Sequence, residues 1–146
     1  MKKILSTILC VCFLFGCAND KPTTLQEDID ALYEGVDKDS IPAYEVIELN
    51  EENFEYFAFV PWCDGIEAVH ADALINALPH SVVLIRKTDD SVDLEKMAEE
   101  IKENANPAKW VCVEAEQSEV VVNDDELLLV MTSKDLADQM IANFMD

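Results

Sequence analysis

Hydrophobic residues recur at helical spacing in four segments of the chain. Apolar positions three or four residues apart predict amphipathic helices over 25–34, over 66–78, from about 91 to 106, and after residue 132. Thr24 followed by Glu27 forms a capping box, which marks the start of the first helix. Ser91 is the expected N-cap of the third helix, whose apolar stripe lies opposite a row of Glu and Lys residues.

Shorter apolar runs with β-branched residues predict strands between these helices. The predicted strands are 43–49, 81–85, 110–115, 119–122 and 127–131. Segment 81–85 is apolar on both faces and should lie in the middle of a covered sheet, whereas 43–49 is expected at an edge. Residues 123–126 (Asn-Asp-Asp-Glu) are the expected hairpin loop between the last two strands. The segment between Asn50 and Pro61 is compatible with either a short helix or a strand.

The order of these elements predicts an α+β domain over residues 25–146. Three strands lie close together near the end of the chain, which favours antiparallel pairing. The expected architecture is a two-layer sandwich, with a four- to five-stranded, mostly antiparallel sheet and helices on one face. The alternative is a thioredoxin-like α/β fold, which the order of elements after Cys63 resembles: Trp62 and Cys63 precede a predicted helix, and Pro107 precedes a predicted strand.

The first 17 residues have the pattern of an export signal. Lys2 and Lys3 form a basic start, and a mainly apolar run from Ile4 to Phe15 follows. A basic start, a short apolar core and a small residue before the cut are typical of a secretory signal peptide, here predicted as residues 1–16. The apolar run is shorter than the roughly 20 residues that span a bilayer.

Leu14-Phe15-Gly16-Cys17 resembles the lipobox of bacterial lipoproteins. This resemblance implies cleavage before Cys17, lipidation of that cysteine with fatty acyl groups such as palmitate, and attachment to the membrane surface from outside the cytoplasm. Two acyl chains provide stable anchoring where one chain gives only marginal binding. Residues 17–24, polar and containing a proline, would then form the tether between membrane and domain.

Strong negative charge narrows the classes of partner. All 31 acidic residues follow Cys17 but only eight of the ten basic residues do, so the mature chain would carry a net charge of −23. Such a surface repels phosphate backbones and anionic headgroups, and we therefore expect no nucleic-acid partner.

Only two of the five cysteines remain available for other roles after cleavage and lipidation. Cys10 and Cys12 leave with the signal peptide, so Cys63 and Cys112 remain. Two thiols in an exported protein can form a disulfide, although small buried cysteines are also common. Cys63 beside Trp62 also resembles the start of a thioredoxin active site, but Ile66 stands where the second cysteine of that motif belongs.

Other candidate sites have weaker patterns. Cys63, His70, His80 and Cys112 form a conceivable zinc set, but none of their spacings is typical of zinc-binding pairs. The acidic clusters at 89–93 and 123–126 are conceivable Ca²⁺ ligands, but neither follows the Asp-x-Asp-x-Asp-Gly loop pattern. We therefore expect no catalytic residues, no metal and no cofactor.

Three segments of the mature chain resemble a family of small bacterial lipoproteins described only as a domain of unknown function. They are 31–36 (Ala-Leu-Tyr-Glu-Gly-Val), 80–86 (His-Ser-Val-Val-Leu-Ile-Arg) and 100–113, which includes Asn-Pro-Ala-Lys-Trp-Val-Cys. The resemblance implies an exported lipoprotein and brings no assigned activity. The sequence thus predicts a membrane-anchored, non-enzymatic binding module with a possible protein partner in the cell envelope. The alternative is a thiol-dependent oxidoreductase that uses Cys63.

Overall fold

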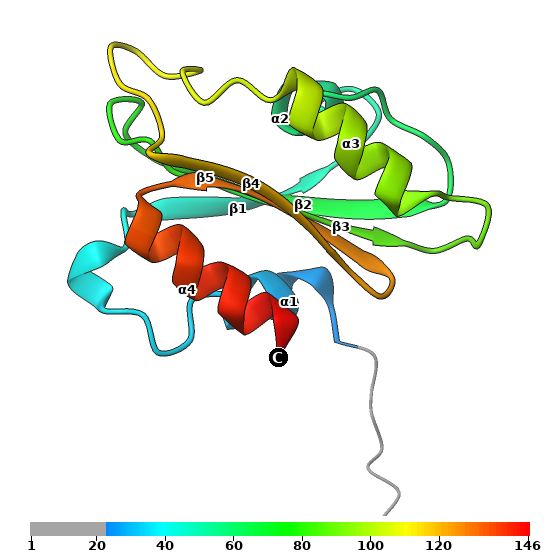
Figure 1. Cartoon of the computed structure of the whole chain (residues 1–146), viewed down its shortest axis with the longest axis horizontal. Coiled ribbons are helices and arrows are strands. Elements are labelled where there is room, and N and C mark those ends of the chain that lie inside the picture. Colours follow the sequence, from blue (N-terminus) through cyan, green and yellow to red (C-terminus); the bar gives the residue numbers. More distant parts are fainter. Residues whose placement is uncertain (1–22) are drawn as a thin grey trace, which may run out of the picture.

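One open antiparallel sheet of five strands is the centre of the fold (Figure 1). The structure is a computed structural model that describes residues 23–146, so the predicted signal peptide and Cys17 lie outside the described residues. The strands follow the spatial order β1-β2-β3-β5-β4, and every neighbouring pair is antiparallel. Their bounds are β1 Tyr44–Leu49, β2 Ile66–Ala73, β3 Ser81–Lys87, β4 Gln117–Asn123 and β5 Glu126–Thr132.

The helices lie on both faces of this sheet. Helices α2 (Phe54–Ala58) and α3 (Leu94–Asn104) cover one face, and α1 (Leu25–Ala31) and α4 (Lys134–Met145) cover the other (Figure 1). Each face has its own hydrophobic core: Ile101 packs with Val83 and Leu129 on one side, and Ile29 packs with Leu84 and Val130 on the other. The predicted α+β class is confirmed. The central strands are apolar on both faces, so helices cover both faces rather than the single face expected.

Local sequence signals explain where the helices begin. Thr24 and Glu27 form the predicted capping box at α1, with the Glu27 amide donating to Thr24 Oγ1 at 3.2 Å. Asp93, rather than Ser91, caps α3, because its Oδ1 accepts the Lys96 amide hydrogen at 3.0 Å. Ser133 is the N-cap residue of α4. Within residues 23–146 there is no helix with the length and apolar character needed to cross a membrane.

Segment 66–78, predicted as a helix, forms strand β2 and the loop after it. β2 lies between β1 and β3, so residues of both faces are buried, among them Ala68, Val69 and Ala71. Burial on both faces produces apolar residues at helix-like intervals, and three alanines add helical propensity. Pairing with two neighbouring strands overrides that local preference.

Segment 110–115, predicted as a strand, lies in the long connection between α3 and β4. Trp110 and Ala115 are buried at the margin of the core while Val111 is exposed, so the apolar residues cover a core edge without forming a ladder. Cys112 adopts a left-handed backbone conformation with φ of 63°, which is incompatible with a continuous strand. The segment between Asn50 and Pro61 is compatible in sequence with a helix or a strand, and its residues 54–58 form the short helix α2.

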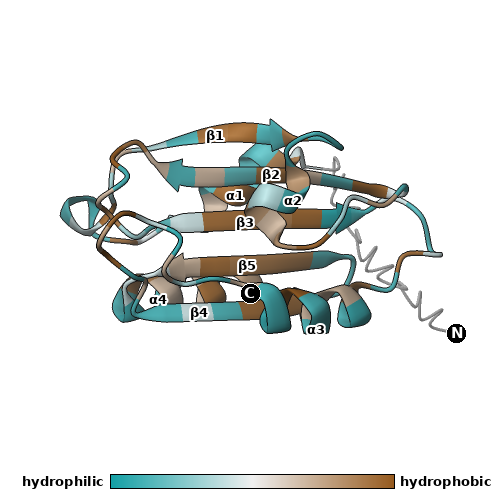
Figure 2. Ribbon diagram, turned by 90° about the horizontal axis from the view of Figure 1, so that it is seen from above, coloured by the Kyte–Doolittle hydropathy of each residue, from teal (hydrophilic) through white to brown (hydrophobic). Residues whose placement is uncertain are grey.

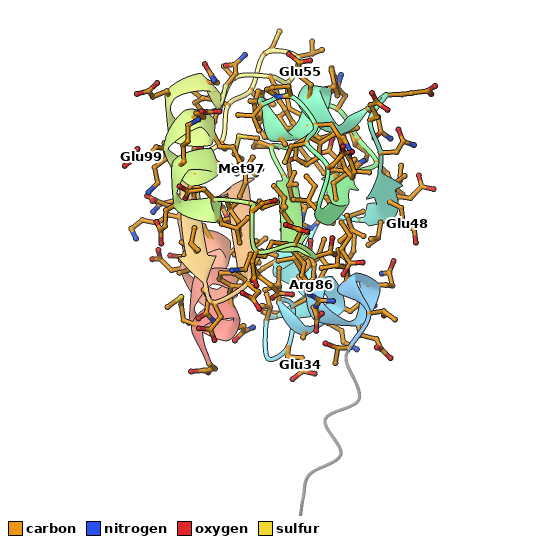
Figure 3. All side chains as sticks on the ribbon, turned by 90° about the vertical axis from the view of Figure 1, so that its right-hand side faces the viewer. Glu34, Glu48, Glu55, Arg86, Met97 and Glu99 are labelled. Carbon is orange, nitrogen blue, oxygen red and sulfur yellow. The ribbon has the colours of Figure 1, made fainter. Side chains whose placement is uncertain are left out.

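We call the two ends of the sheet proximal and distal, according to their distance from the first described residues. The proximal end holds the first described residues: Arg86, near the end of β3, donates from Nη1 to the Thr23 carbonyl oxygen at 3.0 Å. Arg86 also pairs with Asp28 of α1, with Glu126 at 2.6 Å and with Glu67 at 3.2 Å. Figure 3 looks onto this end, with Arg86 beside α1. The distal end is where β2 ends and β3 begins, about 20 Å away along the seven residues of β3.

Candidate functional site

Exposed hydrophobic side chains gather at the distal end of the sheet. The exposed fractions are 63 % for Leu74, 58 % for Ile75, 40 % for Leu78 and 62 % for Val111. These residues come from two loops, 74–80 and 105–116, and the Val111 amide donates to the Asn76 carbonyl oxygen at 3.4 Å. We call these four residues the distal apolar face. In Figure 2, hydrophobic colour appears in the loops at the left-hand end of the sheet, where β2 ends and β3 begins. Contiguous exposed apolar side chains on a globular domain are typical of interaction sites.

Backbone hydrogen bonds hold the first of these loops in shape. The Ala73 amide donates to the His80 carbonyl oxygen at 3.0 Å and closes the loop between β2 and β3. The Leu74 amide donates to Ala43, just before β1, at 2.9 Å, and the Leu78 amide donates to Ile75 at 2.9 Å. The loop is therefore tied to three strands, although its side chains face solvent.

Two adjoining hollows lie beside the distal apolar face. One has a volume of about 360 Å³ and is lined by Pro42, Leu78, Pro79 and Val113 together with Glu114 and Glu116. The other has a volume of about 250 Å³ and includes Asp37 and Asp135. Both hollows include Ser40 and Ser133, so they share part of their walls and lie side by side. We call them together the acidic groove, because four carboxylates and no Lys or Arg line them.

A buried polar cluster fastens the second loop to the sheet. Lys109 Nζ donates to Ser81 Oγ at 2.8 Å and lies 3.4 Å from Asp72 Oδ1. The same ammonium lies over the rings of Phe57 and Trp110, at 5.4 Å and 5.2 Å from their centroids. Burial lowers the pKa of Lys109, and Asp72 opposes that shift. The cluster thereby links segment 105–116, which carries Val111 of the distal apolar face, to β2, β3 and α2.

The Ser81–Lys109 pair has the residue types of a serine nucleophile with a lysine base. A Lys with a lowered pKa can act as a base toward a Ser hydroxyl. Ser81, however, has no exposed surface, so a substrate has no access to its oxygen. The geometry therefore supports a positioning role for Ser81 and Lys109.

The two histidines lie on opposite faces of the sheet. His70 is buried on the α2 side, with its ring stacked on Phe57 at a centroid distance of 3.7 Å. His80 is buried on the α1 side, between the Tyr33 hydroxyl at 2.8 Å and Thr132 Oγ1 at 3.0 Å. Burial lowers the pKa of His70 and lowers that of His80 to about 4. Both are therefore neutral at pH 7, and they do not converge on a shared metal.

The acidic clusters at the proximal end are engaged by the protein itself. Asp89 Oδ1 accepts the Ser91 amide hydrogen at 2.8 Å, Asp93 caps α3, and Asp125 pairs with Lys87 at 2.9 Å. Across residues 23–146, no group of three or more Cys, His, Asp or Glu side chains is arranged to hold a metal ion. The conceivable zinc and Ca²⁺ sets are therefore not assembled in the described residues.

Cys63 occupies a hollow of about 430 Å³ between segment 60–64 and the start of α3. Burial raises the pKa of its thiol, and the neighbouring Asp64 carboxylate raises it further. The element after Cys63 is strand β2, so no helix N-terminus stabilises a thiolate there. The sheet is wholly antiparallel, and no peptide bond in the described range, including that of Pro107, is cis. The thioredoxin-like alternative is wrong for this fold.

Cys63 and Cys112 are both free thiols in the structure. Cys63 lies just before β2, whereas Cys112 follows Val111, which contacts the loop after the end of β2. The eight residues of β2 separate these positions by about 23 Å. A disulfide needs Cα atoms within about 7 Å, so this geometry leaves the possible Cys63–Cys112 bridge unformed.

Sequence reasoning missed the distal apolar face. The helix predicted over 66–78 contains Leu74 and the strand predicted over 110–115 contains Val111, so neither prediction places these residues in an exposed loop. A run of apolar residues ending in Leu78-Pro79 is the available signal, since a proline so close to strand β3 points to a loop.

Comparison with known proteins gives no relative. No protein-family model matches the chain, and neither curated proteins nor solved structures match it significantly. The function must therefore be argued from the geometry and the sequence.

Proposed function

We propose that this chain is a lipid-anchored, extracytoplasmic binding protein that presents its distal apolar face to a partner protein of the cell envelope. Acyl groups on Cys17 would hold it to the membrane, as the lipobox resemblance at 14–17 implies. The proposal assigns no catalytic step to the domain.

One observation carries the proposal: the first described residues and the distal apolar face lie at opposite ends of the sheet. Thr23 is bonded to Arg86 near the end of β3, and the distal loops lie beyond the start of the same strand. Residues 17 to 23 reach at most about 20 Å when fully extended. An anchor at Cys17 would therefore keep the proximal end near the membrane and direct the distal apolar face away from it.

The charge of the domain is compatible with this orientation. Acidic residues exceed basic ones by 23 after Cys17, so anionic headgroups repel the domain and the short tether keeps it upright. The oxidoreductase alternative has no supporting observation at Cys63, where the pKa of the thiol is raised. A catalytic thiol needs a lowered pKa.

Anchoring is tested by intact mass and by incorporation of a clickable palmitate analogue. We expect a chain that starts at Cys17 and carries acyl mass, and we expect no incorporation in the Cys17→Ala variant. An unmodified chain, or one that retains residues 1–16, would contradict the lipid anchor.

Binding through the distal face is tested by site-specific photo-crosslinking in cells. A photoreactive amino acid at Leu74 is compared with one at Met145, a similarly exposed residue at the other end of the sheet, 51 % exposed. Met145 lies at the proximal end, because the side-chain amide of Asn123, at the proximal hairpin, donates to the carbonyl oxygen of Phe144 at 2.8 Å. Discrete crosslinked proteins from position 74 and none from position 145 are expected. Equal yields at both positions would contradict a specific distal face.

A further inference from the structure

We propose that the acidic groove and the distal apolar face together bind a polypeptide segment in which apolar side chains are flanked by Lys or Arg. This inference rests on the proposed function and names the chemical class of the partner.

The charge of the groove selects basic residues. Glu114, Glu116, Asp37 and Asp135 line it, and no Lys or Arg lines it. Glu116 Oε2 accepts the Lys134 amide hydrogen at 3.1 Å, which fixes that carboxylate at the start of α4. The Lys134 ammonium does not line the groove: it is paired with Asp138 at 2.5 Å, and that pair together with the nearby Asp135 carboxylate raises the pKa of Lys134.

Two of these carboxylates are available to a partner. Among the ion pairs of the described residues, none involves Glu114 or Asp135. Both side chains are exposed at the rim of the groove. Opposite charges at a rim steer association and fix register, while the apolar centre supplies most of the affinity.

The apolar part of the site is adjacent to these charges. Leu78 belongs both to the distal apolar face and to the wall of the 360 Å³ hollow, with Pro79 and Val113 beside it. A hollow of this size is at the lower end of the range that proteins use for ligands and buried anchor side chains. Apolar anchors on the partner would fill it, and basic neighbours would meet the acidic rim.

Other occupants fit less well. Anionic membranes and nucleic acids carry the same sign of charge as the groove. A second copy of this chain carries the same negative charge and would be repelled as well. A cationic, partly apolar polypeptide is the partner class that satisfies both the rim and the centre.

The test uses the mature acylated protein in nanodiscs of zwitterionic phosphatidylcholine, with empty nanodiscs as the background. The probe is a short fluorescent peptide in which Leu and Phe alternate with Lys. Its matched controls replace every Lys by Glu, or every Leu and Phe by Ser. Fluorescence anisotropy is expected to show saturable binding of the Lys peptide alone, with weaker binding at high salt.

Protein variants locate the site. Glu114→Gln with Asp135→Asn should weaken binding by about fivefold through loss of two rim charges. Leu78→Ser with Val111→Ser should weaken it by about tenfold or more through loss of apolar contact. Glu99→Gln with Glu103→Gln makes the same charge change as the rim variant on the exposed face of α3, away from the groove (Glu99 in Figure 3), and should bind like wild type. Thermal melting verifies that each variant is folded, and single substitutions replace any pair that is not.

The outcomes separate this inference from the proposed function. Equal binding of the Glu peptide, or equal weakening by the α3 control, overturns the inference. Crosslinks from position 74 without binding of the Lys peptide overturn the inference alone. Absence of crosslinks from position 74 overturns the proposed function, whatever the peptide does.

Discussion

His80 Nδ1 lies 3.0 Å from Thr132 Oγ1, and this buried contact joins the start of β3 to the end of β5. The other ring nitrogen lies 2.8 Å from the Tyr33 hydroxyl. A neutral imidazole has one donor and one acceptor, and two hydroxyl groups satisfy both. Burial holds the pKa of His80 at about 4, against 6.5 in an unfolded chain.

This pKa difference predicts acid sensitivity of the fold. Between pH 6.5 and about 4 the unfolded chain binds the proton and the folded chain does not, so the stability that His80 contributes is complete above pH 6.5 and is lost as pH falls. The loss should be roughly 3 kcal/mol across that window. Urea denaturation at several pH values measures it. His80→Gln, which does not titrate, should give a flatter profile than wild type, and parallel profiles would contradict the assignment.

The parts of the fold that follow from sequence are those in which local signals and tertiary packing agree. Segment 81–85 has an apolar run bounded by turns and lies in the middle of the sheet as β3, and the α3 stripe packs as its spacing indicates. The helix predicted over 66–78 is wrong because a strand buried on both faces has apolar residues at helix-like intervals, and its alanines add helical propensity. The distal site could not be predicted, since it depends on Val111 meeting Asn76, 35 positions earlier in the chain.

Arg86 is expected to be the most important charged side chain for stability. It is 22 % exposed and pairs with Asp28, Glu126 and Glu67. Arg86→Met would leave these partly buried carboxylates without a cation, so we expect a loss of about 2 kcal/mol in the free energy of unfolding at pH 7. Lys96→Met is the matched control, because Lys96 is 72 % exposed and its pair with Glu100 should contribute less than about 0.5 kcal/mol. Similar losses in both variants would argue against the Arg86 network.

Two glycines with left-handed backbones should respond differently to alanine. Gly65 has φ of +87°, and an added Cβ would lie 2.9 Å from Asp89 Cβ and 3.1 Å from Val92 Cγ2. Gly35 has φ of +70° with open space around it. Gly35→Ala should cost about 1 kcal/mol from backbone strain alone, and Gly65→Ala should cost clearly more. Chemical denaturation of both variants gives the comparison, and equal costs would mean that the segment around Asp89 moves freely.

The two free thiols should react at different rates and without prior reduction. Cys112 is exposed, whereas Cys63 is partly buried and its thiol pKa is raised by burial and by Asp64. The thiolate is the reactive form, so alkylation at pH 7.5 should modify Cys112 first. Mass spectrometry of peptides over a time course measures the order. Modification of either residue only after reduction would mean that a disulfide forms in solution.

Lys109 is predicted to keep the distal loops in place for binding. Its side chain is 11 % exposed, and it holds Ser81 and Asp72 together beneath segment 105–116. Lys109→Met preserves much of the packing against Phe57 and Trp110 but leaves Asp72 partly buried without its cation, so we expect a loss of about 2 kcal/mol. Hydrogen exchange should become faster in segments 74–80 and 105–116 while β5 and α3 stay protected. Lys102→Met on the exposed surface of α3 is the control and should leave the exchange pattern unchanged. Uniformly faster exchange in the Lys109 variant would mean that the cluster supports the whole domain rather than the distal site.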